Sequence, residues 1–257
     1  MLAVSLLALG MTTTLSYGAD AKQRVDVYAP EHAAGAPVAV FFHGGVWQHG
    51  GRADYTDFGD ALARRGFVVF VASYRLTPPA RWPAQAEDAA AVVALALKEA
   101  KRFGGDPHKL VVIGHSAGAQ MAAMLAYDPR FLAAKGHAPQ DIRALALLSG
   151  VFDLTKPLDE SQADGGFKTF VEPTFGTDKK ALAAASPVAV ASKRGVPFLL
   201  VTSEHDYAAM RKQTLAMQKA LGALGESVTF LDVPVVDHFG IVHADATADA
   251  IARLLPR

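Results

Sequence analysis

The stretch KLVVIGHSAGAQMAAM, residues 109–124, places a G-x-S-x-G pattern between an apolar run and an alanine-rich segment. The run 109–114 predicts a buried strand, and residues 116–128 predict a helix that ends before Pro129. The pattern alone arises by chance in roughly one chain in ten of this length. At a strand-to-helix junction it is typical of a sharp turn that exposes the hydroxyl of Ser116 above the sheet. The alternative is an ordinary turn in which this serine caps the helix.

The two glycines of the pattern have a steric explanation. The turn is so sharp that a Cβ atom at Gly114 or Gly118 would clash with the neighbouring strand or helix. The helix that follows presents unpaired N–H groups and the positive end of its dipole to the same place. The pattern therefore predicts a nucleophilic Ser116 at the top of the sheet.

Strand-like and helix-like segments alternate along the rest of the chain. The expected strands cover residues 38–42, 67–74, 109–114, 143–150, 197–203 and 227–234, and the expected helices cover 57–66, 85–105, 116–128, 207–225 and 246–255. Most of these strands are continuous apolar runs, as strands buried on both faces are. We therefore expect an α/β fold with a mostly parallel sheet and helices on both faces.

One segment interrupts this alternation. Residues 151–190 hold four phenylalanines and several turn residues, and they are longer than an ordinary connection. Long insertions in such folds usually carry function. Because the chain has no internal repeat and no linker rich in Pro, Gly or Ser, we expect one domain over residues 1–257, with 151–190 as a small cap-like insertion.

Composition excludes several classes of protein and of site. Hydrophobic residues make up 51% and charged residues 19% of the chain, which excludes disorder. Lys+Arg and Asp+Glu both number 25, so no basic field exists to attract nucleic acid. The chain has no cysteine, which excludes disulfides, thiol catalysis and cysteine-ligated zinc. We expect a monomer or homodimer that acts on a small molecule and needs no cofactor and no metal.

The amino terminus leaves two interpretations. Residues 1–11 are apolar enough for a short signal segment, but no Lys or Arg precedes them, and the run is too short to span a bilayer. Residues 1–14 are either a signal remnant or disordered segment, or the start of a mature cytoplasmic chain. We expect no stable membrane insertion and favour a cytoplasmic location over a secreted or periplasmic one.

A serine hydroxyl becomes a nucleophile when a base takes its proton and an acid orients that base. In this type of fold the acid follows a late strand. The sequence PFLLVTSEHDY, residues 197–207, offers Glu204 and Asp206. We select Asp206 because it lies at the loop tip before the next helix. Glu204 is the first alternative, followed by Asp232 and Asp237.

The base is expected directly after the last strand. His238 is the first histidine there, in the sequence VDHFG, which suits a loop. His243 falls in the next helical turn and is the alternative base, whereas His205 is expected to be structural or exposed. The candidate catalytic triad is therefore Ser116, Asp206 and His238. The competing interpretation makes His238 an ordinary surface histidine.

The stretch AVFFHGGVWQHG, residues 39–50, supplies a second part of the same machinery. Attack on a carbonyl creates an oxyanion, and each fixed N–H donor aimed at it contributes on the order of 100- to 1000-fold in rate. Glycines let the backbone approach a substrate closely. We therefore expect the oxyanion hole at Gly44, Gly45 and Ala117, with His43 bracing the loop by hydrogen bonds.

Two other interpretations of this loop are open. One is a plain tight turn. The other is a metal site formed by His43, His49 and His115. The metal interpretation lacks a carboxylate partner and the H-x-x-x-H spacing that places two histidines on one helical face.

Several motifs together resemble the α/β-hydrolase superfamily. They are FFHGGVW, ASYRLTP with RWPAQAEDAAAVV, GGDPHKLVVIGHSAGA, LSGVFDL, ASPV, and SEHD with DHF, and they extend from about residue 15 to the C-terminus. Within the superfamily the chain is similar to the small serine esterases related to hormone-sensitive lipase, to feruloyl-esterase-like proteins and to kynurenine formamidase. The segment LSYGADAKQRVDVYAP, residues 15–30, is similar to the first strands of that fold.

The resemblance implies the α/β-hydrolase fold and carries over the triad and the oxyanion-hole residues named above. Val46 departs from the formamidase group, which often has a larger residue there. The implied function is hydrolysis of small acyl or aryl carboxylic esters through an acyl-enzyme. An arylformamidase with the same triad is the first alternative, and a ligand-binding receptor without catalysis is the second. The aromatic residues expected either to line the substrate pocket or to belong to the core are Trp47, Phe152, Phe239, Phe167, Phe170 and Phe175.

Overall fold

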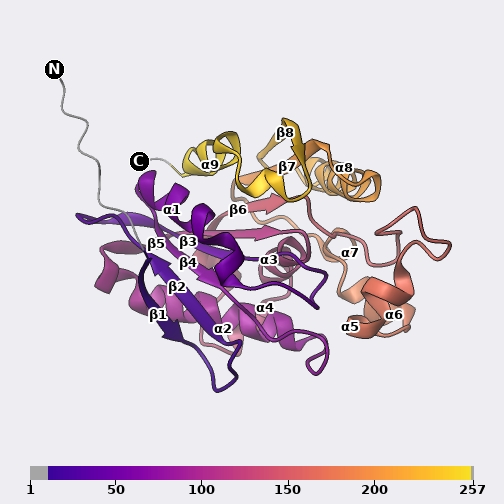
Figure 1. Ribbon diagram of the computed structural model, residues 1–257, viewed down its shortest axis with the longest axis horizontal. Helices are drawn as coiled ribbons and strands as arrows, with labels where there is room; N and C mark the ends of the chain where they lie inside the picture. The colour runs from indigo at the N-terminus through magenta and orange to yellow at the C-terminus, as the bar shows by residue number, and fades with distance from the viewer. Residues whose placement is uncertain (1–10, 256–257) are drawn as a thin grey trace.

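An eight-stranded sheet runs through the computed structural model, which describes residues 11–255 (Figure 1). The strands are β1 (Met11–Ser16), β2 (Arg24–Tyr28), β3 (Ala36–Phe42), β4 (Val68–Ala72), β5 (Gly105–His115), β6 (Ile142–Leu148), β7 (Phe198–His205) and β8 (Val228–Asp237). Their order across the sheet is β1-β2-β4-β3-β5-β6-β7-β8. β2 pairs antiparallel with β1 and β4, and every other neighbouring pair is parallel. The fold class expected from the sequence is confirmed.

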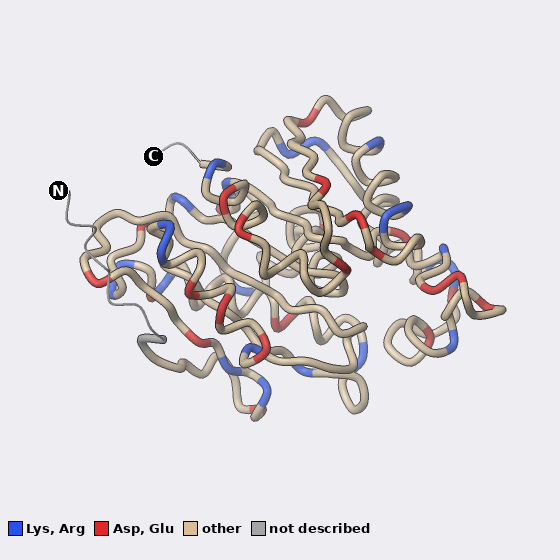
Figure 2. The backbone as a smooth tube through the Cα atoms, turned by 45° about the horizontal axis from the view of Figure 1, so that its top comes forward, with Lys and Arg blue, Asp and Glu red and all other residues tan. Residues whose placement is uncertain are grey.

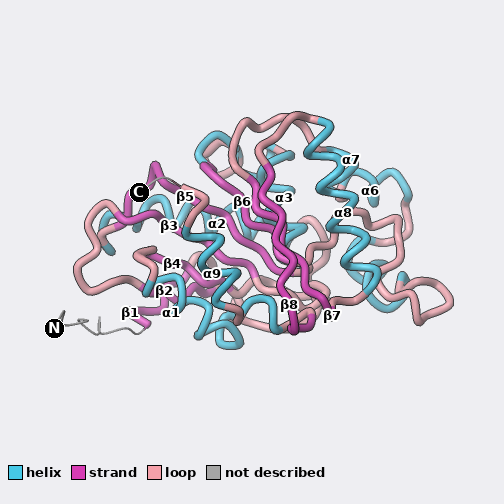
Figure 3. The backbone as a smooth tube through the Cα atoms, turned by 90° about the horizontal axis from the view of Figure 1, so that it is seen from above, coloured by secondary structure: helices cyan, strands magenta, loops and turns pink. Residues whose placement is uncertain are grey.

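Helices cover both faces of this sheet, as the view from above makes plain (Figure 3). Those on one face are α2 (Ala84–Glu99), α3 (Ala117–Tyr127) and α8 (Ala208–Ala223), and those on the other are α1 (Thr56–Arg64) and α9 (Asp245–Ala252). Side chains of a strand alternate between the two faces, so Val40 packs with the first group and Phe41 with the second. Because both faces of the sheet are buried, the sequences of these strands are apolar at nearly every position.

The insertion at residues 151–190 folds into short helical pieces beyond the edge of the sheet (Figure 1). They are a π-helical turn (Phe167–Val171), α5 (Glu172–Phe175), α6 (Lys179–Ala184) and α7 (Pro187–Val190). The last of these packs against α3 and α8. A further short helix, α4 (Pro129–Ala133), follows α3, and 3-10 turns lie at Arg52–Tyr55, Ala100–Phe103, Pro139–Asp141 and Gly240–Val242.

The structure can be compared with what the sequence predicted for the amino terminus, for membrane insertion and for the distribution of charge. Residues 1–10 lie outside the described residues, and residues 11–14 belong to β1. The expectation for residues 1–14 stays a prediction. Within residues 11–255 no helix is both long and apolar enough to cross a membrane. Acidic and basic residues are interspersed along the chain in Figure 2, in keeping with the formal charge of zero.

The register of the sheet brings the candidate site residues to one edge. The paired residues there are Phe42 with Gly114, His115 with Leu148, Leu148 with Val201, and His205 with Asp237. Ser116 directly follows the pair of His115 and Leu148, and Asp206 and His238 directly follow the pair of His205 and Asp237. The glycine loop and the candidate residues Ser116, Asp206 and His238 therefore meet at the carboxyl ends of the parallel strands, where ligands bind in such sheets.

Candidate active site

Ser116 occupies the turn between β5 and α3 in a strained backbone conformation. Its φ is 53° and its ψ is −117°, a combination that non-glycine residues rarely adopt. A Cβ atom on Gly114 would lie 2.2 Å from the carbonyl oxygen of Gly118, and one on Gly118 would lie 2.1 Å from that of Phe42. The steric explanation for both glycines is confirmed. Ser116 is buried and lines a cavity that opens to the surface, and its hydroxyl has no hydrogen-bond partner within residues 11–255.

Asp206 and His238 are hydrogen-bonded to each other at the ends of β7 and β8. Oδ1 of Asp206 lies 2.8 Å from Nδ1 of His238, and the aspartate side chain is fully buried. The backbone N–H of Tyr207 donates to Oδ1 at 2.8 Å, and the hydroxyl of Thr202 donates to Oδ2 at 3.2 Å. An acid held in this way can orient an imidazole and stabilise its protonated form.

These contacts determine which nitrogen of His238 carries the proton. A carboxylate only accepts hydrogen bonds, so its contact with Nδ1 requires an Nδ1–H group. In the neutral ring Nε2 then has a free lone pair. Ser116 and His238 line the same cavity, although no direct hydrogen bond joins them in the described part of the chain. The arrangement suits Nε2 to accept the proton of the serine as a ligand enters.

The alternative acids are hydrogen-bonded to groups other than His238, and the alternative histidines are exposed. Glu204 accepts a backbone N–H of β8, and Asp232 pairs with an arginine of α8. Asp237 accepts two N–H groups of the turn that follows it. His205 is exposed, as expected from the sequence, and His243 lies exposed at the cavity. Of the acids considered, only Asp206 is hydrogen-bonded to His238 within residues 11–255.

The glycine loop after β3 lies against the serine turn. A Cβ atom on Gly44 would lie 3.0 Å from Cβ of Ser116, and one on Gly45, whose φ is 111°, would lie 2.3 Å from a backbone oxygen. The N–H of Gly44 is already engaged, because it donates to the hydroxyl of Tyr55 at 3.3 Å. The N–H groups of Gly45 and Ala117 have no acceptor among the described residues and are free for a ligand.

His43 braces this loop from the core side, as the sequence predicted. Its Nδ1 lies 2.6 Å from the carbonyl oxygen of Gly44, and its ring stacks on that of Tyr74 with the centroids 4.2 Å apart. Burial lowers the pKa of His43 to about 4, so the ring is neutral near pH 7. In the part of the chain that the structure describes, no three His, Asp or Glu side chains come together as metal ligands.

A cavity of about 570 Å³ opens beside Ser116. Phe239 and Phe170 line it, together with apolar residues of the glycine loop, the insertion and α8. Trp47 and Phe152 do not line it, which corrects the expectation that they contact substrate. Both are fully buried in the core, where the indole N–H of Trp47 donates to a glutamine of α3 at 3.2 Å. A φ of 60° at Trp47 accompanies this inward placement.

Comparisons with known proteins agree with this architecture. The BD-FAE family model matches residues 25–221. The chain belongs to the BD-FAE family. It is 29% identical to esterase LipC of Mycobacterium tuberculosis over 93% of this chain and 63% of LipC, so it spans less than two thirds of that relative. It is 26% identical to kynurenine formamidase of Danio rerio over 91% of this chain and 78% of the formamidase.

A solved structure supports the fold independently. Esterase B from Lactobacillus rhamnosis superposes with a TM-score of 0.81 at 20% identity, over 95% of this chain and 85% of that chain. This likeness agrees with the fold that the resemblance implies. The BD-FAE match covers the glycine loop, Ser116 and Asp206 but ends before His238. A role for His238 therefore rests on its contact with Asp206 and not on the BD-FAE match.

The sequence did not predict a series of hydrogen bonds that links the glycine loop to His238 beneath the candidate active site. The N–H on Nε2 of His115 donates to the carbonyl oxygen of His238 at 2.9 Å, so Nδ1 of His115 accepts from the hydroxyl of Tyr55 at 3.3 Å. Tyr55 in turn accepts the N–H of Gly44. Burial holds the pKa of His115 well below its usual range and raises that of Tyr55 to about 12, so both groups are neutral near pH 7. No sequence spacing signals this link between the glycine loop and the base.

We expect Tyr55→Phe to lower kcat/KM by about tenfold, because the N–H of Gly44 and Nδ1 of His115 both lose a hydrogen bond. Kinetics on 4-nitrophenyl acetate measure the effect. The ring of Tyr55 packs on Phe41 and is kept in this variant. Tyr127→Phe is the matched control, since the buried hydroxyl of Tyr127 has no partner within residues 11–255. Equal losses in the two variants would refute a role for the Tyr55 hydroxyl.

Proposed function

We propose that this protein is a serine hydrolase of carboxylic esters in which Ser116 is the nucleophile, His238 the base and Asp206 the orienting acid. The observation that carries the proposal is the 2.8 Å contact between Asp206 and Nδ1 of His238. It leaves Nε2 of the base free at a cavity that Ser116 also lines. Membership of the BD-FAE family and the similarity to esterase LipC support the same reaction class.

In the proposed reaction, Nε2 of His238 takes the proton of Ser116 as its oxygen attacks the ester carbonyl. The N–H groups of Gly45 and Ala117 donate to the oxyanion of the tetrahedral intermediate. The intermediate collapses to an acyl-enzyme as His238 gives its proton to the leaving alcohol. A water molecule, deprotonated by the same nitrogen, then attacks the acyl group. The second tetrahedral intermediate that forms then collapses. This step releases the carboxylic acid, and His238 returns its proton to the oxygen of Ser116.

The insertion at residues 151–190 is proposed as a small cap over this site, within one domain that spans the chain. Four of its residues support the proposal, because Val151, Leu158, Asp159 and Phe170 all line the cavity. The cap then contributes mostly apolar surface to the acyl side of the pocket. Replacement of these residues is expected to change acyl-chain preference rather than the chemical step.

Aromatic side chains flank the base at the mouth of the cavity. The ring centroids of Tyr207 and Phe239 lie 5.1 Å and 5.2 Å from that of His238. Both rings are unusually exposed for their size, at 57% for Tyr207 and 54% for Phe239. Because His238 must protonate the leaving group, that group has to lie beside these rings. We therefore propose an aryl or other apolar leaving group.

The charge of the cavity separates the two candidate substrates. Among the described residues its lining holds the carboxylates of Asp54 and Asp159 and no Lys or Arg. A substrate whose free carboxylate entered this cavity would meet like charge without a Lys or Arg counterion. N-formylkynurenine carries a carboxylate at its α-amino acid end, beside an ammonium group and remote from the formamide carbonyl. The similarity to kynurenine formamidase supports that amide as the second candidate, and the lining favours a neutral ester.

We expect 4-nitrophenyl butyrate to be hydrolysed with a kcat/KM about tenfold higher than mono-4-nitrophenyl succinate, which has the same acyl length but carries a carboxylate. Asp159→Asn removes one of the two carboxylates of the lining, so we expect the difference in kcat/KM between these two esters to become smaller in this variant. N-formylkynurenine, assayed alongside, is expected to turn over more slowly than the butyrate ester. Faster turnover of N-formylkynurenine would replace the ester proposal by the formamidase. Equal rates for the two nitrophenyl esters would contradict the charge argument.

A further inference from the structure

Ser149, the residue that follows β6, is held in an unusual conformation beside the acid and the base. It is fully buried and its φ is 44°, a left-handed value that glycine adopts more readily than serine. Its backbone N–H donates to the carbonyl oxygen of Val201 on β7 at 2.7 Å. A non-glycine residue kept in a strained conformation at a site suggests that its side chain is needed there.

The hydroxyl of Ser149 contacts both partners of the charged pair. It lies 2.5 Å from Oδ2 of Asp206 and 2.9 Å from Nδ1 of His238. The hydroxyl has one proton, and a carboxylate oxygen can only accept, so that proton is donated to Asp206. Towards His238 the same oxygen can then only accept. This second contact requires a proton on Nδ1, as the contact between Asp206 and His238 also does.

The N–H on Nδ1 is therefore shared between two acceptors, the Oδ1 atom of Asp206 and the Oγ atom of Ser149. The three groups form a closed triangle in which the serine oxygen holds both the carboxylate and the ring. Without this hydroxyl, Oδ2 of Asp206 keeps only the longer contact with Thr202, at 3.2 Å, among the described residues. The carboxylate could then rotate, and the ring would lose its second acceptor.

We propose that Ser149 is a positioning residue of this hydrolase. Its hydroxyl fixes the carboxylate of Asp206 against the imidazole of His238 and keeps the imidazole proton on Nδ1, so that Nε2 stays directed at Ser116. The inference rests on the proposed serine hydrolase function, but the triangle itself can be tested without turnover. The residue acts through His238 and does not touch the substrate.

Two substitutions separate the hydroxyl from the backbone strain. Ser149→Ala removes the hydroxyl and keeps the strained φ, whereas Ser149→Gly removes the hydroxyl and relieves the strain. We expect both variants to lose kcat on 4-nitrophenyl butyrate by about 10- to 100-fold, with KM within about twofold of wild type. The glycine variant is expected to unfold at a higher urea concentration than the alanine variant. The loss of kcat would then be due to the missing hydroxyl, because both variants show it. The difference in stability between the two variants would be due to the backbone strain at position 149.

Ser203→Ala is the matched control. Ser203 is also fully buried, on β7, and its hydroxyl has no partner within residues 11–255. We expect this variant to keep wild-type kcat. If both Ser149 variants also kept wild-type kcat while Ser116→Ala was inactive, the positioning role would be overturned and the hydrolase proposal would stand. If wild type itself turned over no ester, the hydrolase proposal would fail instead.

A spectroscopic readout tests the triangle without substrate. A downfield proton resonance of the Nδ1–H group of His238 is identified by its loss in His238→Ala. In Ser149→Ala and Ser149→Gly we expect this resonance to shift or broaden by exchange, because the proton has lost one of its two acceptors. In Ser203→Ala it is expected to be unchanged. A resonance that is identical in wild type and both Ser149 variants would overturn the proposal.

Discussion

Ser116→Ala is expected to lower kcat for 4-nitrophenyl esters by about 10⁴-fold or more, because the proposed acyl-enzyme forms on this oxygen. The fold is expected to survive. The serine hydroxyl has no hydrogen-bond partner within residues 11–255, so its loss leaves no group unsatisfied. Alanine keeps the Cβ atom and therefore the same backbone strain. The urea unfolding midpoint is expected to stay close to that of wild type.

A fluorophosphonate probe gives the complementary result. We expect it to label wild type with one equivalent and to leave Ser116→Ala unlabelled. His238→Ala keeps the serine but loses its base, so labelling is expected to be much slower. A Ser116→Ala variant with undiminished turnover would disprove the assignment of the nucleophile. Failure of wild type to react would favour the receptor interpretation, in which the fold binds a ligand without catalysis.

The strands and the glycines of the site could be predicted because their causes are local. A strand buried on both faces must be apolar throughout, and the bend at Ser116 leaves no room for a Cβ atom on Gly114 or Gly118. Asp206 could be selected because the acid follows a late strand in this fold. The register of β7 and β8 then explains its contact with His238, since His205 pairs with Asp237 directly before them.

Other parts of the site depend on contacts between distant segments. Ser149 lies 57 positions from Asp206 and 89 positions from His238, and although it belongs to the LSGVFDL motif, no spacing in the sequence places its hydroxyl beside those two residues. Trp47 and Phe152 illustrate the opposite difficulty. An aromatic residue near a site suits a pocket wall and a core equally well by composition. The direction of its side chain decides, and that direction follows from the backbone conformation and the neighbours it meets.

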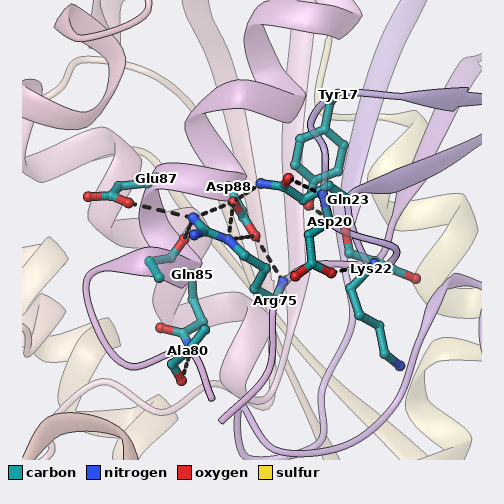
Figure 4. A network of polar contacts seen from close by, with 11 residues as sticks. Tyr17, Asp20, Lys22, Gln23, Arg75, Ala80, Gln85, Glu87 and Asp88 are labelled. Atoms are coloured by element: carbon teal, nitrogen blue, oxygen red, sulfur yellow. Dashed lines mark hydrogen bonds and ion pairs between the residues drawn. The ribbon is translucent and has the colours of Figure 1, made fainter. Parts of the chain in front are cut away.

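The second large expected effect concerns stability, and it arises away from the cavity. Asp88 on α2 has a side chain that is 2% exposed, and its carboxylate accepts hydrogen bonds from four N–H donor groups of Arg75 and Gln23 (Figure 4). These are the backbone N–H of Arg75 at 2.8 Å, its Nε at 3.0 Å, its Nη2 at 2.8 Å, and Nε2 of Gln23 at 2.7 Å. One carboxylate thus joins α2 to the chain after β4 and to the turn between β1 and β2.

We expect Asp88→Asn to lower the free energy of unfolding by about 2–3 kcal/mol, measured by urea denaturation. Breaking a fully buried ion pair costs about 3–5 kcal/mol, but the side chain of Arg75 is 30% exposed, and water reduces the penalty. Asparagine has nearly the same shape, yet its amide turns two donors towards other donors. The guanidinium loses its buried counterion and keeps the carbonyl oxygen of Ala84 and the exposed carboxylate of Glu87. Because these residues do not line the cavity beside Ser116, kcat of the folded variant is expected to be unchanged.

Asp128→Asn is the control that isolates burial. Asp128 also pairs with an arginine, at 2.6 Å, but the side chain of Arg130 is 82% exposed. Asparagine also preserves the cap that Asp128 provides to α4. An exposed pair contributes about 0–1 kcal/mol, so this variant is expected to lose no more than that. If the two variants were equally stable, the argument that the buried carboxylate of Asp88 holds these three segments together would be refuted. A large loss at position 88 alone would identify burial, rather than the presence of an ion pair, as the cause.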